Sequence, residues 1–189
     1  MSLLPGRARG LHQQPLAPQS WYWESPEVTH QLLNEVTFRG PVHDPCCGSG
    51  RIPIAAREFG YEATGSDIVD RGFGTGGVDF FADMTPRVTL IFNPPSGRRQ
   101  DPTLVNRFIL HAIEVAEEVA AIVPVPMQCG LWRRDNLNRL HPPRHVLALS
   151  DRPSMPPGGT DIKAKGGTMD YCWIVWHRGY RGSTAWRAI

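Results

Sequence analysis

Apolar and polar residues follow two kinds of pattern along most of the chain, one typical of helices and one typical of strands. Apolar residues repeat at helical spacing from Val28 to Val36, behind a Ser-Pro-Glu sequence that begins at Ser25 and is typical of a helix N-terminus, which predicts a helix over residues 26–35. The further helices expected from this period are residues 52–58, 104–115 and 131–140. Short strands are expected at residues 41–44, 63–68, 88–92, 119–125, 145–149 and 171–176, and residues 88–92 are a continuous apolar run apart from Thr89.

This order of elements predicts an α/β fold. Strands that alternate with helices form a mainly parallel sheet covered on both faces, and right-handed crossovers give a doubly wound, Rossmann-like arrangement. The last two expected strands have no clear helix between them, which favours a terminal antiparallel hairpin.

The chain of 189 residues is long enough for one well-buried core. Residues 1–20 are rich in Pro, Gly, Arg and Gln without apolar periodicity, so we expect a flexible N-terminal arm followed by a single domain over residues 21–189. The proline- and glycine-rich stretch 151–170 indicates a mobile connection or lid.

Composition argues against a membrane protein, a secreted disulfide-rich protein and a cysteine-based metal site. No stretch approaches the roughly 18 to 20 apolar residues of a membrane span, and the N-terminus lacks a secretory signal, so we expect a cytoplasmic protein without a membrane partner. The four cysteines, Cys46, Cys47, Cys129 and Cys172, fit neither a disulfide framework nor a metal site. The net charge of +2 is too small to establish a nucleic-acid partner. The later half nevertheless gathers Arg133, Arg134, Arg139, Arg144, Arg152, Lys163 and Lys165, for which a solvated polar face is an equally good explanation.

A glycine-rich turn follows the first expected strand of the sheet. It consists of Asp44-Pro45-Cys46-Cys47-Gly48-Ser49-Gly50. Gly48 and Gly50 remove side-chain bulk, and the next helix offers unpaired N–H groups to a ligand. The third glycine of a dinucleotide fingerprint is replaced by Pro53, and the lysine of a phosphate-binding loop is missing. The next strand ends at Asp67, whose carboxylate can accept both ribose hydroxyls, so the turn and Asp67 together predict a nucleoside-containing ligand.

A later apolar strand stops abruptly at Asn93-Pro94-Pro95-Ser96. The prolines end strand pairing, while the Asn93 side-chain oxygen and the Pro94 carbonyl can face the crevice. Two such acceptors hold an –NH2 group with its lone pair toward an electrophile, and they bind more strongly as the nitrogen gains positive charge. An isolated Asn-Pro-Pro is a turn. Its position downstream of the glycine turn and Asp67 favours a site for an amine acceptor that requires no metal.

The Asp44–Gly50 turn and the sequence Gly65-Ser66-Asp67 resemble the cofactor motifs of class I S-adenosylmethionine-dependent methyltransferases. With Asn93-Pro94-Pro95 the resemblance extends to the amino-methyltransferase group of that family. It implies a methyltransferase domain with S-adenosylmethionine as cofactor, with Asp44 at the methionyl ammonium, Asp67 at the ribose and Asp83 at the adenine amino group. The implied cofactor-binding residues are Asp44, Pro45, Cys46, Gly48, Gly50, Asp67, Ile68, Asp83 and Asn93, and the implied catalytic residues are Asn93, Pro94, Pro95 and Ser96.

Two further segments resemble DNA adenine methyltransferases. Residues 23–26, Trp-Glu-Ser-Pro, are similar to the segment before the cofactor motif in those enzymes, and residues 170–179 are similar to the last strand of the short phage-type members. The resemblance implies DNA as partner and the exocyclic amine of adenine as acceptor. The group also methylates RNA bases and protein glutamine, and these acceptors stay open as alternatives.

Ser96 departs from the family pattern, in which an aromatic residue after Asn-Pro-Pro stacks on a flipped base. Losing such a stack costs about 1 to 3 kcal/mol of base binding. Substitutes elsewhere in the sequence are Trp132, Tyr171, Trp173 and Trp176, for which core packing is the favoured role. Specificity would have to come from residues 97–102, including Arg98 and Arg99, from residues 151–170, or from a partner. The departure leaves two rival classes open: a catalytically inactive S-adenosylmethionine-binding module and a nucleotide-binding protein of the same fold.

Overall fold

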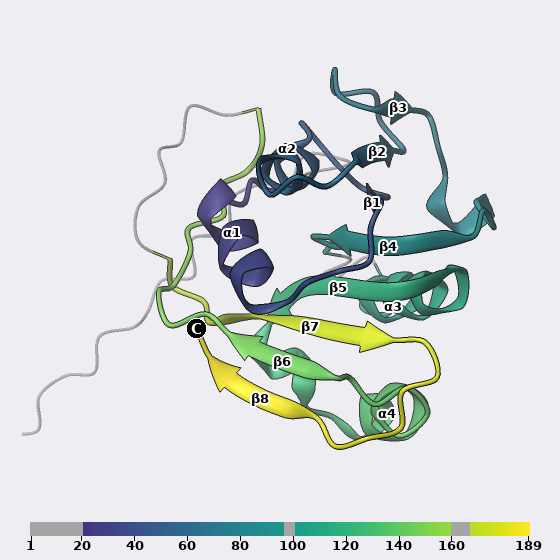
Figure 1. Ribbon diagram of the computed structural model, residues 1–189, viewed down its shortest axis with the longest axis vertical. Coiled ribbons are helices and arrows are strands. Elements are labelled where there is room, and N and C mark those ends of the chain that lie inside the picture. The colour runs from purple at the N-terminus through teal and green to yellow at the C-terminus, as the bar shows by residue number, and fades with distance from the viewer. Residues whose placement is uncertain (1–20, 97–100, 160–166) are drawn as a thin grey trace, which may run out of the picture.

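The computed structural model describes residues 21–96, 101–159 and 167–189, so the expected N-terminal arm lies outside the described residues. The strands in this part of the chain are β1 (Val42–Asp44), β2 (Ala63–Asp67), β3 (Thr75–Gly76), β4 (Arg87–Phe92), β5 (Ala116–Pro124), β6 (His145–Ala148), β7 (Tyr171–His177) and β8 (Ala185–Ala188). Together these eight described strands form one sheet in the order β3-β2-β1-β4-β5-β7-β6-β8 (Figure 1).

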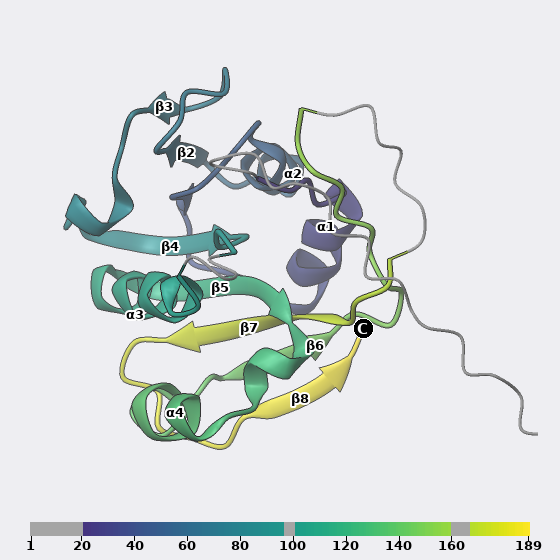
Figure 2. The same cartoon turned by 180° about the vertical axis from the view of Figure 1, so that it is seen from behind.

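Helices cover both faces of this sheet. The helices are α1 (Pro26–Glu35), α2 (Arg51–Glu58), α3 (Leu104–Val115) and the short α4 (Leu131–Arg133). In Figure 1, α1 and α2 lie in front of the sheet, and Figure 2 shows α3 and α4 on the opposite face. The doubly wound arrangement predicted from the order of elements is therefore confirmed.

The strands from β3 to β5 are parallel neighbours, and β7 runs antiparallel between β5 and β6. The predicted terminal antiparallel hairpin is the pair β6 and β7, in which Val146 lies opposite Ile174. Two strands were not predicted: the two-residue β3, and β8, which adds to β6 in parallel at the sheet edge.

The first helix has the predicted bounds. Ser25 occupies the N-cap position without a side-chain cap hydrogen bond, and Pro26 begins the helix. The indole Nε1–H of Trp173, a fully buried residue of β7, donates to the carbonyl oxygen of Val28 at 2.9 Å. A buried hydrogen bond therefore fixes α1 to the sheet, beside the apolar contacts of Leu32 and Leu33.

The helix predicted over residues 131–140 is wrong in its length and type. Only α4 is α-helical, and residues Arg134–Asn138 continue as a π-helix. The apolar residues of this stretch do not share one face, because Leu137 is buried whereas Leu131 is 71% and Leu140 55% exposed. A regular α-helix would have no continuous apolar stripe to bury here.

The chain winds in opposite directions from the centre of the sheet. β2 follows β1 on one side and β5 follows β4 on the other, so β1 and β4 flank a topological switch point. Loops that leave neighbouring strands in opposite directions open a crevice beyond their carboxyl ends. Asp44 ends β1 and Asn93 directly follows β4, so both lie at this crevice. Within the described residues, no helix combines the length and the apolarity needed to cross a membrane.

Candidate active site

A cavity of about 290 Å³ lies at the switch point. The loops after β1, β2 and β4 line it, together with the segment before α1 and the first turns of α2 and α3. Of the residues predicted from the sequence, it brings together Asp44, Pro45, Cys46, Gly48, Asp67, Ile68, Asn93, Pro94, Pro95 and Ser96.

Asp44 brings a carboxylate to the cavity in a position almost closed to solvent. It is 2% exposed, and its Oδ1 accepts a hydrogen bond from the backbone N–H of Cys46 at 3.0 Å. Burial raises the pKa of Asp44 well above its usual range, and the negative charges of Glu24 and Asp67 add to the effect. A buried carboxylate of this kind is stabilised in its ionised form by a cationic ligand group such as an ammonium.

Asp67 ties the glycine turn to the end of β2. Its Oδ2 accepts from the backbone N–H of Gly48 and its Oδ1 accepts from the backbone N–H of Val69, both at 2.9 Å. The Arg71 guanidinium forms an ion pair with the same carboxylate at 3.9 Å. Each carboxylate oxygen has a second lone pair, so Asp67 can still accept hydrogen bonds from a pair of ligand hydroxyls.

The two glycines of the turn have different neighbours. Gly48 lines the cavity with φ +54°, and a Cβ there would lie 2.7 Å from the ring of Trp21. Gly50, with φ +83°, lies outside the cavity as the described residues form it, and a Cβ there would lie 2.2 Å from the ring of Phe73. The bulk removed at Gly50 therefore makes room for a protein side chain and not for a ligand.

Asp83, expected at the adenine amino group, forms hydrogen bonds with protein groups through both carboxylate oxygens. Its Oδ1 accepts from the backbone N–H of Thr85, and its Oδ2 accepts from Arg87, both at 2.9 Å. The hydrogen bonds with Thr85, followed by Arg87, lower the pKa of Asp83 to about 2. Asp83 lies outside the cavity formed by the described residues, whereas Asp79, four residues earlier, lines it together with Phe81.

Asp79, and not the expected Asp83, is the aspartate of this segment that lines the cavity. It caps the turn Phe80–Ala82, where its Oδ1 accepts from the backbone N–H of Phe81 at 3.0 Å. The signal in the sequence was present, because an aspartate directly before a short apolar turn is a typical N-cap.

The cysteines near the site are free thiols, of which Cys47 is buried and Cys46 partly buried. Cys46 donates through Sγ to the backbone carbonyl of Asn93 at 3.1 Å, and burial raises its pKa well above the usual range. Burial also raises the pKa of Cys47 to about 12. The thiolate is the nucleophilic form of cysteine, so neither side chain has the properties of a nucleophile.

Glu24 is a site residue that the sequence reasoning did not assign. It lines the cavity and is 6% exposed, and its Oε2 accepts a hydrogen bond from Asn93 Nδ2 at 3.0 Å. Burial raises the pKa of Glu24, an effect that the Asn93 hydrogen bond and the charge of Arg51 partly offset. Glu24 belongs to neither a strand nor a helix, so no periodicity marked it in the sequence.

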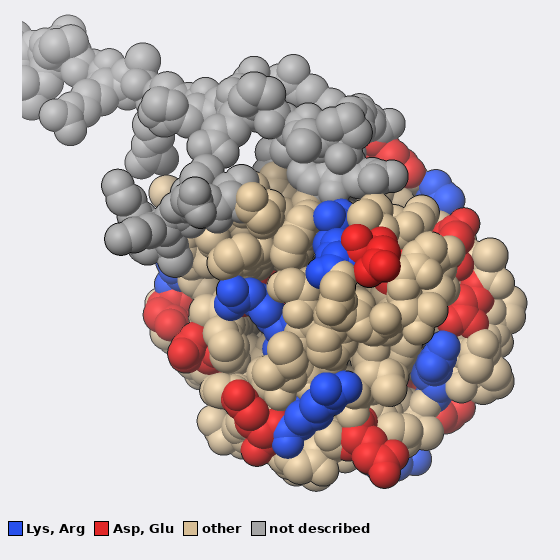
Figure 3. All heavy atoms as spheres, turned by 90° about the horizontal axis from the view of Figure 1, so that it is seen from above, with Lys and Arg blue, Asp and Glu red and all other residues tan. Residues whose placement is uncertain are grey.

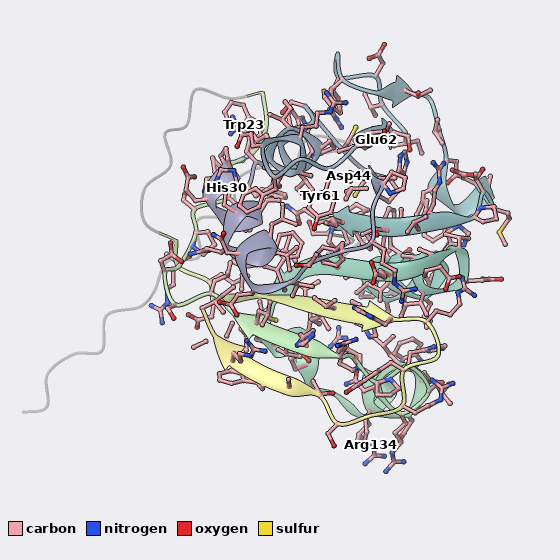
Figure 4. All side chains as sticks on the ribbon, viewed as in Figure 1. Trp23, His30, Asp44, Tyr61, Glu62 and Arg134 are labelled. Carbon is pink, nitrogen blue, oxygen red and sulfur yellow. The ribbon has the colours of Figure 1, made fainter. Side chains whose placement is uncertain are left out.

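A short ribbon holds the segment that carries Glu24. Tyr22 and Pro157 form an antiparallel bridge, Trp23 N–H donates to Pro156 O at 3.0 Å, and Gly158 N–H donates to Trp21 O at 2.8 Å. These hydrogen bonds join the cavity wall to residues 156–158 of the stretch 151–170, for which a mobile connection or lid was predicted. Figure 4 labels Trp23 beside α1 and Asp44 deeper in the molecule, at the end of β1.

The expected aromatic substitutes for a residue after Asn-Pro-Pro lie away from the cavity. Trp173 and Trp176 are buried in the core, the role that the sequence favoured for them. Trp132, for which core packing was also favoured, is 49% exposed on α4. Arg134, next to α4, lies at the lower margin of Figure 4, far from Asp44. Aromatic side chains that do line the cavity are Trp21, Tyr22, Phe80, Phe81 and Phe108. Arg98, Arg99, Lys163 and Lys165 lie outside the described residues.

Histidines do not take part in the cavity wall formed by the described residues. His43 contacts Thr64 Oγ1 at 2.8 Å and Ser66 Oγ at 3.0 Å, and burial lowers its pKa to about 4. It is therefore a neutral strand residue at pH 7. Across the described ranges, His, Cys, Asp and Glu side chains form no group that could hold a metal ion.

Comparisons with known proteins agree on the fold. No family model and no curated protein matches the sequence. Among solved structures, a protein from Pyrococcus horikoshii described as a candidate RNA methyltransferase matches with a TM-score of 0.60 and 15% identity, over 81% of this chain and 82% of that chain. Magnesium protoporphyrin IX methyltransferase from Synechocystis, solved with bound S-adenosylmethionine, matches with a TM-score of 0.53 and 16% identity, over 81% and 77%.

A third match comes from a restriction system. The modification subunit of a candidate type I restriction enzyme from Vibrio vulnificus matches with a TM-score of 0.58 and 13% identity, over 89% of this chain and 47% of that chain. At these identities the likeness concerns the fold. This chain therefore has the Rossmann-like α/β fold of the S-adenosylmethionine-dependent methyltransferases.

Proposed function

We propose that this chain is an S-adenosylmethionine-dependent methyltransferase that methylates an amino group, and that the amino group of adenine in DNA is its acceptor. The observation that carries the proposal is the placement of Asn93 and Pro94 in the same cavity as Asp44 and Asp67. The first pair suits an amine acceptor, and the second pair suits the two polar ends of the cofactor. The shared fold of the methyltransferases named above supports the reaction class.

The residues of the cavity fit the cofactor at three points. Asp44 offers a buried carboxylate for the methionyl ammonium, and Asp67 offers lone pairs for the ribose hydroxyls. Ile68, which is 60% exposed and lines the cavity, offers an apolar surface for the adenine ring. The cofactor supplies an electrophilic methyl group on its sulfonium.

Asn93 and Pro94 would act on the acceptor. The Asn93 side-chain oxygen and the Pro94 carbonyl accept hydrogen bonds from the –NH2 group and direct its lone pair toward the methyl group. Positive charge grows on the nitrogen during transfer, so both hydrogen bonds become stronger in the transition state than in the ground state. The Cys46 thiol, bound to the Asn93 carbonyl, helps to hold this loop in place.

DNA is preferred to RNA and to protein because residues 23–26 and residues 170–179 resemble segments of DNA adenine enzymes. The fold match to the modification subunit from Vibrio vulnificus also favours DNA as the acceptor. The match to the Pyrococcus horikoshii protein supports an RNA base as the second candidate. On the face shown in Figure 3, basic and acidic side chains are interspersed. That face therefore has no broad positive patch among the described residues that it shows.

The test is transfer of tritium from labelled S-adenosylmethionine into duplex DNA, single-stranded DNA, RNA and a protein extract, with Asn93→Ala beside the wild type. Label in DNA adenine that falls about 100-fold or more in the variant would support the proposal. Label in another pool would move the acceptor to RNA or protein. Cofactor binding without transfer to any pool would support an inactive cofactor-binding module.

A further inference from the structure

A buried carboxylate lies next to the amide that we assign to the acceptor. Glu24 is two residues before α1 and 69 residues from Asn93 in the sequence, yet its carboxylate accepts the Asn93 Nδ2–H at 3.0 Å. Both side chains line the cavity. Burial of an ionisable group is costly, so a carboxylate held at this place needs compensating partners or a function.

The backbone on both sides of Glu24 is fixed. Trp23 donates through its backbone N–H to Pro156, and the ring of Trp23 lies 4.3 Å from the guanidinium carbon of Arg51. On the other side, Ser25 is the N-cap residue of α1 and its carbonyl accepts from Val28 N–H at 3.1 Å. The side chain of Glu24 therefore starts from a backbone position that α1, α2 and the Pro156 loop jointly define.

The chemistry of the pair is directional. An ionised carboxylate accepts hydrogen bonds and donates none, whereas a side-chain amide has a donating NH2 group and an accepting oxygen. Asn93 can therefore turn only its NH2 group toward ionised Glu24. A rotation of the amide by 180° would place Oδ1 against the carboxylate and replace an attraction with a repulsion.

We propose that Glu24 is a positioning residue that fixes the orientation of the Asn93 amide, so that Oδ1 is the atom offered to the acceptor amine. This inference rests on the proposed function of the cavity. It assigns a role to the segment before α1, whose residues Trp21, Tyr22 and Glu24 line the cavity. Without Glu24, Asn93 would populate both amide orientations, and in one of them a donor would face the donor groups of the substrate.

The protonation state of Glu24 is part of this role. A protonated carboxyl group can donate to Asn93 Oδ1 and so permits the wrong amide orientation. The charged and titratable groups that act on Glu24 or respond to it are Arg51 from α2, Asp44 from the end of β1 and Cys46 from the following loop. Burial raises the pKa of Glu24, so the loss of orientation begins at a higher pH than it would for an exposed glutamate.

The first experiment is a double-mutant cycle on methyl transfer with Glu24→Ala, Asn93→Ala and the double variant, at saturating cofactor. We expect Glu24→Ala to lower kcat about 10- to 100-fold, comparable to one hydrogen bond to a charged group, with little change in cofactor affinity. Because Glu24 acts through Asn93, the double variant should be no slower than Asn93→Ala alone. Additive losses would overturn the inference. Glu27→Gln, a change of an exposed acid three residues later, serves as the control with wild-type rates.

The second experiment uses Glu24→Gln, which keeps the shape of the side chain in case the alanine variant folds poorly. Gln can both donate and accept, so we expect lower kcat and loss of the acidic limb of the rate profile that the wild type shows. An acidic limb at the same pH in both proteins would contradict the role of Glu24. Full wild-type kcat in the glutamine variant would do the same.

A third measurement does not depend on turnover. The side-chain amide signals of Asn93 in nuclear magnetic resonance, identified by their loss in Asn93→Ala, should shift with pH in the wild type and stay constant in Glu24→Gln. Asn93 side-chain signals that do not change with pH in the wild type would contradict the contact between Glu24 and Asn93. If no pool is methylated, the proposed function fails, while this titration still decides whether Glu24 orients Asn93.

Discussion

The backbone N–H of Gly48 donates a hydrogen bond of 2.9 Å to the carboxylate of Asp67, so the protein's own chain holds the turn after β1 against the end of β2. Both residues line the cavity, and Asp67 accepts from Val69 N–H as well. One carboxylate therefore shapes the cofactor loop and still has lone pairs for a ligand.

Replacing Asp67 should disturb both roles. Asp67→Asn keeps a carbonyl oxygen for one of the two backbone N–H groups but places an NH2 group against the other. We expect S-adenosylmethionine affinity to fall about 100-fold, as two hydrogen bonds to a charged acceptor weaken, and the melting temperature to fall as well. Isothermal calorimetry and thermal melts measure the two effects. Unchanged affinity would place the ribose elsewhere.

The contact between Gly48 and Trp21 can be tested with a matched pair of glycines. Gly48 and Gly60 both have positive φ, +54° and +85°, so an alanine at either position costs about 1 to 2 kcal/mol in backbone strain. A Cβ at Gly48 would also lie 2.7 Å from the Trp21 ring, whereas at Gly60 it would meet nothing within 4 Å. Gly48→Ala should therefore lower stability more than Gly60→Ala and alter the tryptophan fluorescence. Equal effects of both variants would show that the Trp21 contact is unimportant.

Much of this site follows from the sequence because its residues mark the ends of strands. Asp44, Asp67 and Asn93 each stand where a predicted strand ends, and parallel strands bring such positions to one edge of a sheet. The strands β1, β2, β4 and β5 of the parallel core and the antiparallel pair of β6 and β7 were likewise predicted, because each is a short segment bounded by a turn or a helix.

The rest depends on contacts that have no local signal. Glu24 reaches Asn93 across 69 residues, and the partner of Gly50 is Phe73, a ring in a loop with no apolar period. Asp83 and Asp79 have the same chemistry in the sequence, and only the structure shows that Asp83 is held by Thr85 and Arg87 outside the cavity whereas Asp79 lines it. The edge strand β8 has four residues, too few for an alternation of polar and apolar positions to be recognised.

The hydrogen bond from Trp173 Nε1 to the Val28 carbonyl predicts a stability effect without a direct effect on the cavity. Trp173 is fully buried, so Trp173→Phe removes the indole donor to the Val28 carbonyl, which keeps only its partner within α1, and leaves a small void. We expect the free energy of unfolding to fall by about 1 to 3 kcal/mol. Urea denaturation measures it, and cofactor affinity of the folded fraction should stay at the wild-type level. A stability equal to that of the wild type would show that the hydrogen bond contributes nothing net.

Asp44 should stabilise the bound cofactor at the expense of the protein's own stability. Burial raises the pKa of Asp44 in the folded chain above its value in the unfolded chain, so between these two values the folded state binds more protons. The free energy of unfolding therefore decreases as pH rises through this window, and the destabilisation is complete above it. Asp44→Asn does not titrate and should abolish this contribution.

We accordingly expect Asp44→Asn to match the wild type near pH 4 and to melt at least a few degrees higher than the wild type at pH 7, in the absence of cofactor. The same variant should lose S-adenosylmethionine affinity by about 10- to 100-fold, because an amide cannot pair with the methionyl ammonium. In the wild type, cofactor affinity should weaken as pH falls, since protonation neutralises Asp44. Melting curves from pH 4 to 8 and calorimetry over the same range measure both trends. A variant that is less stable than the wild type by a constant amount at every pH would mean that the carboxylate is already compensated by the protein, and the ammonium would then need another partner.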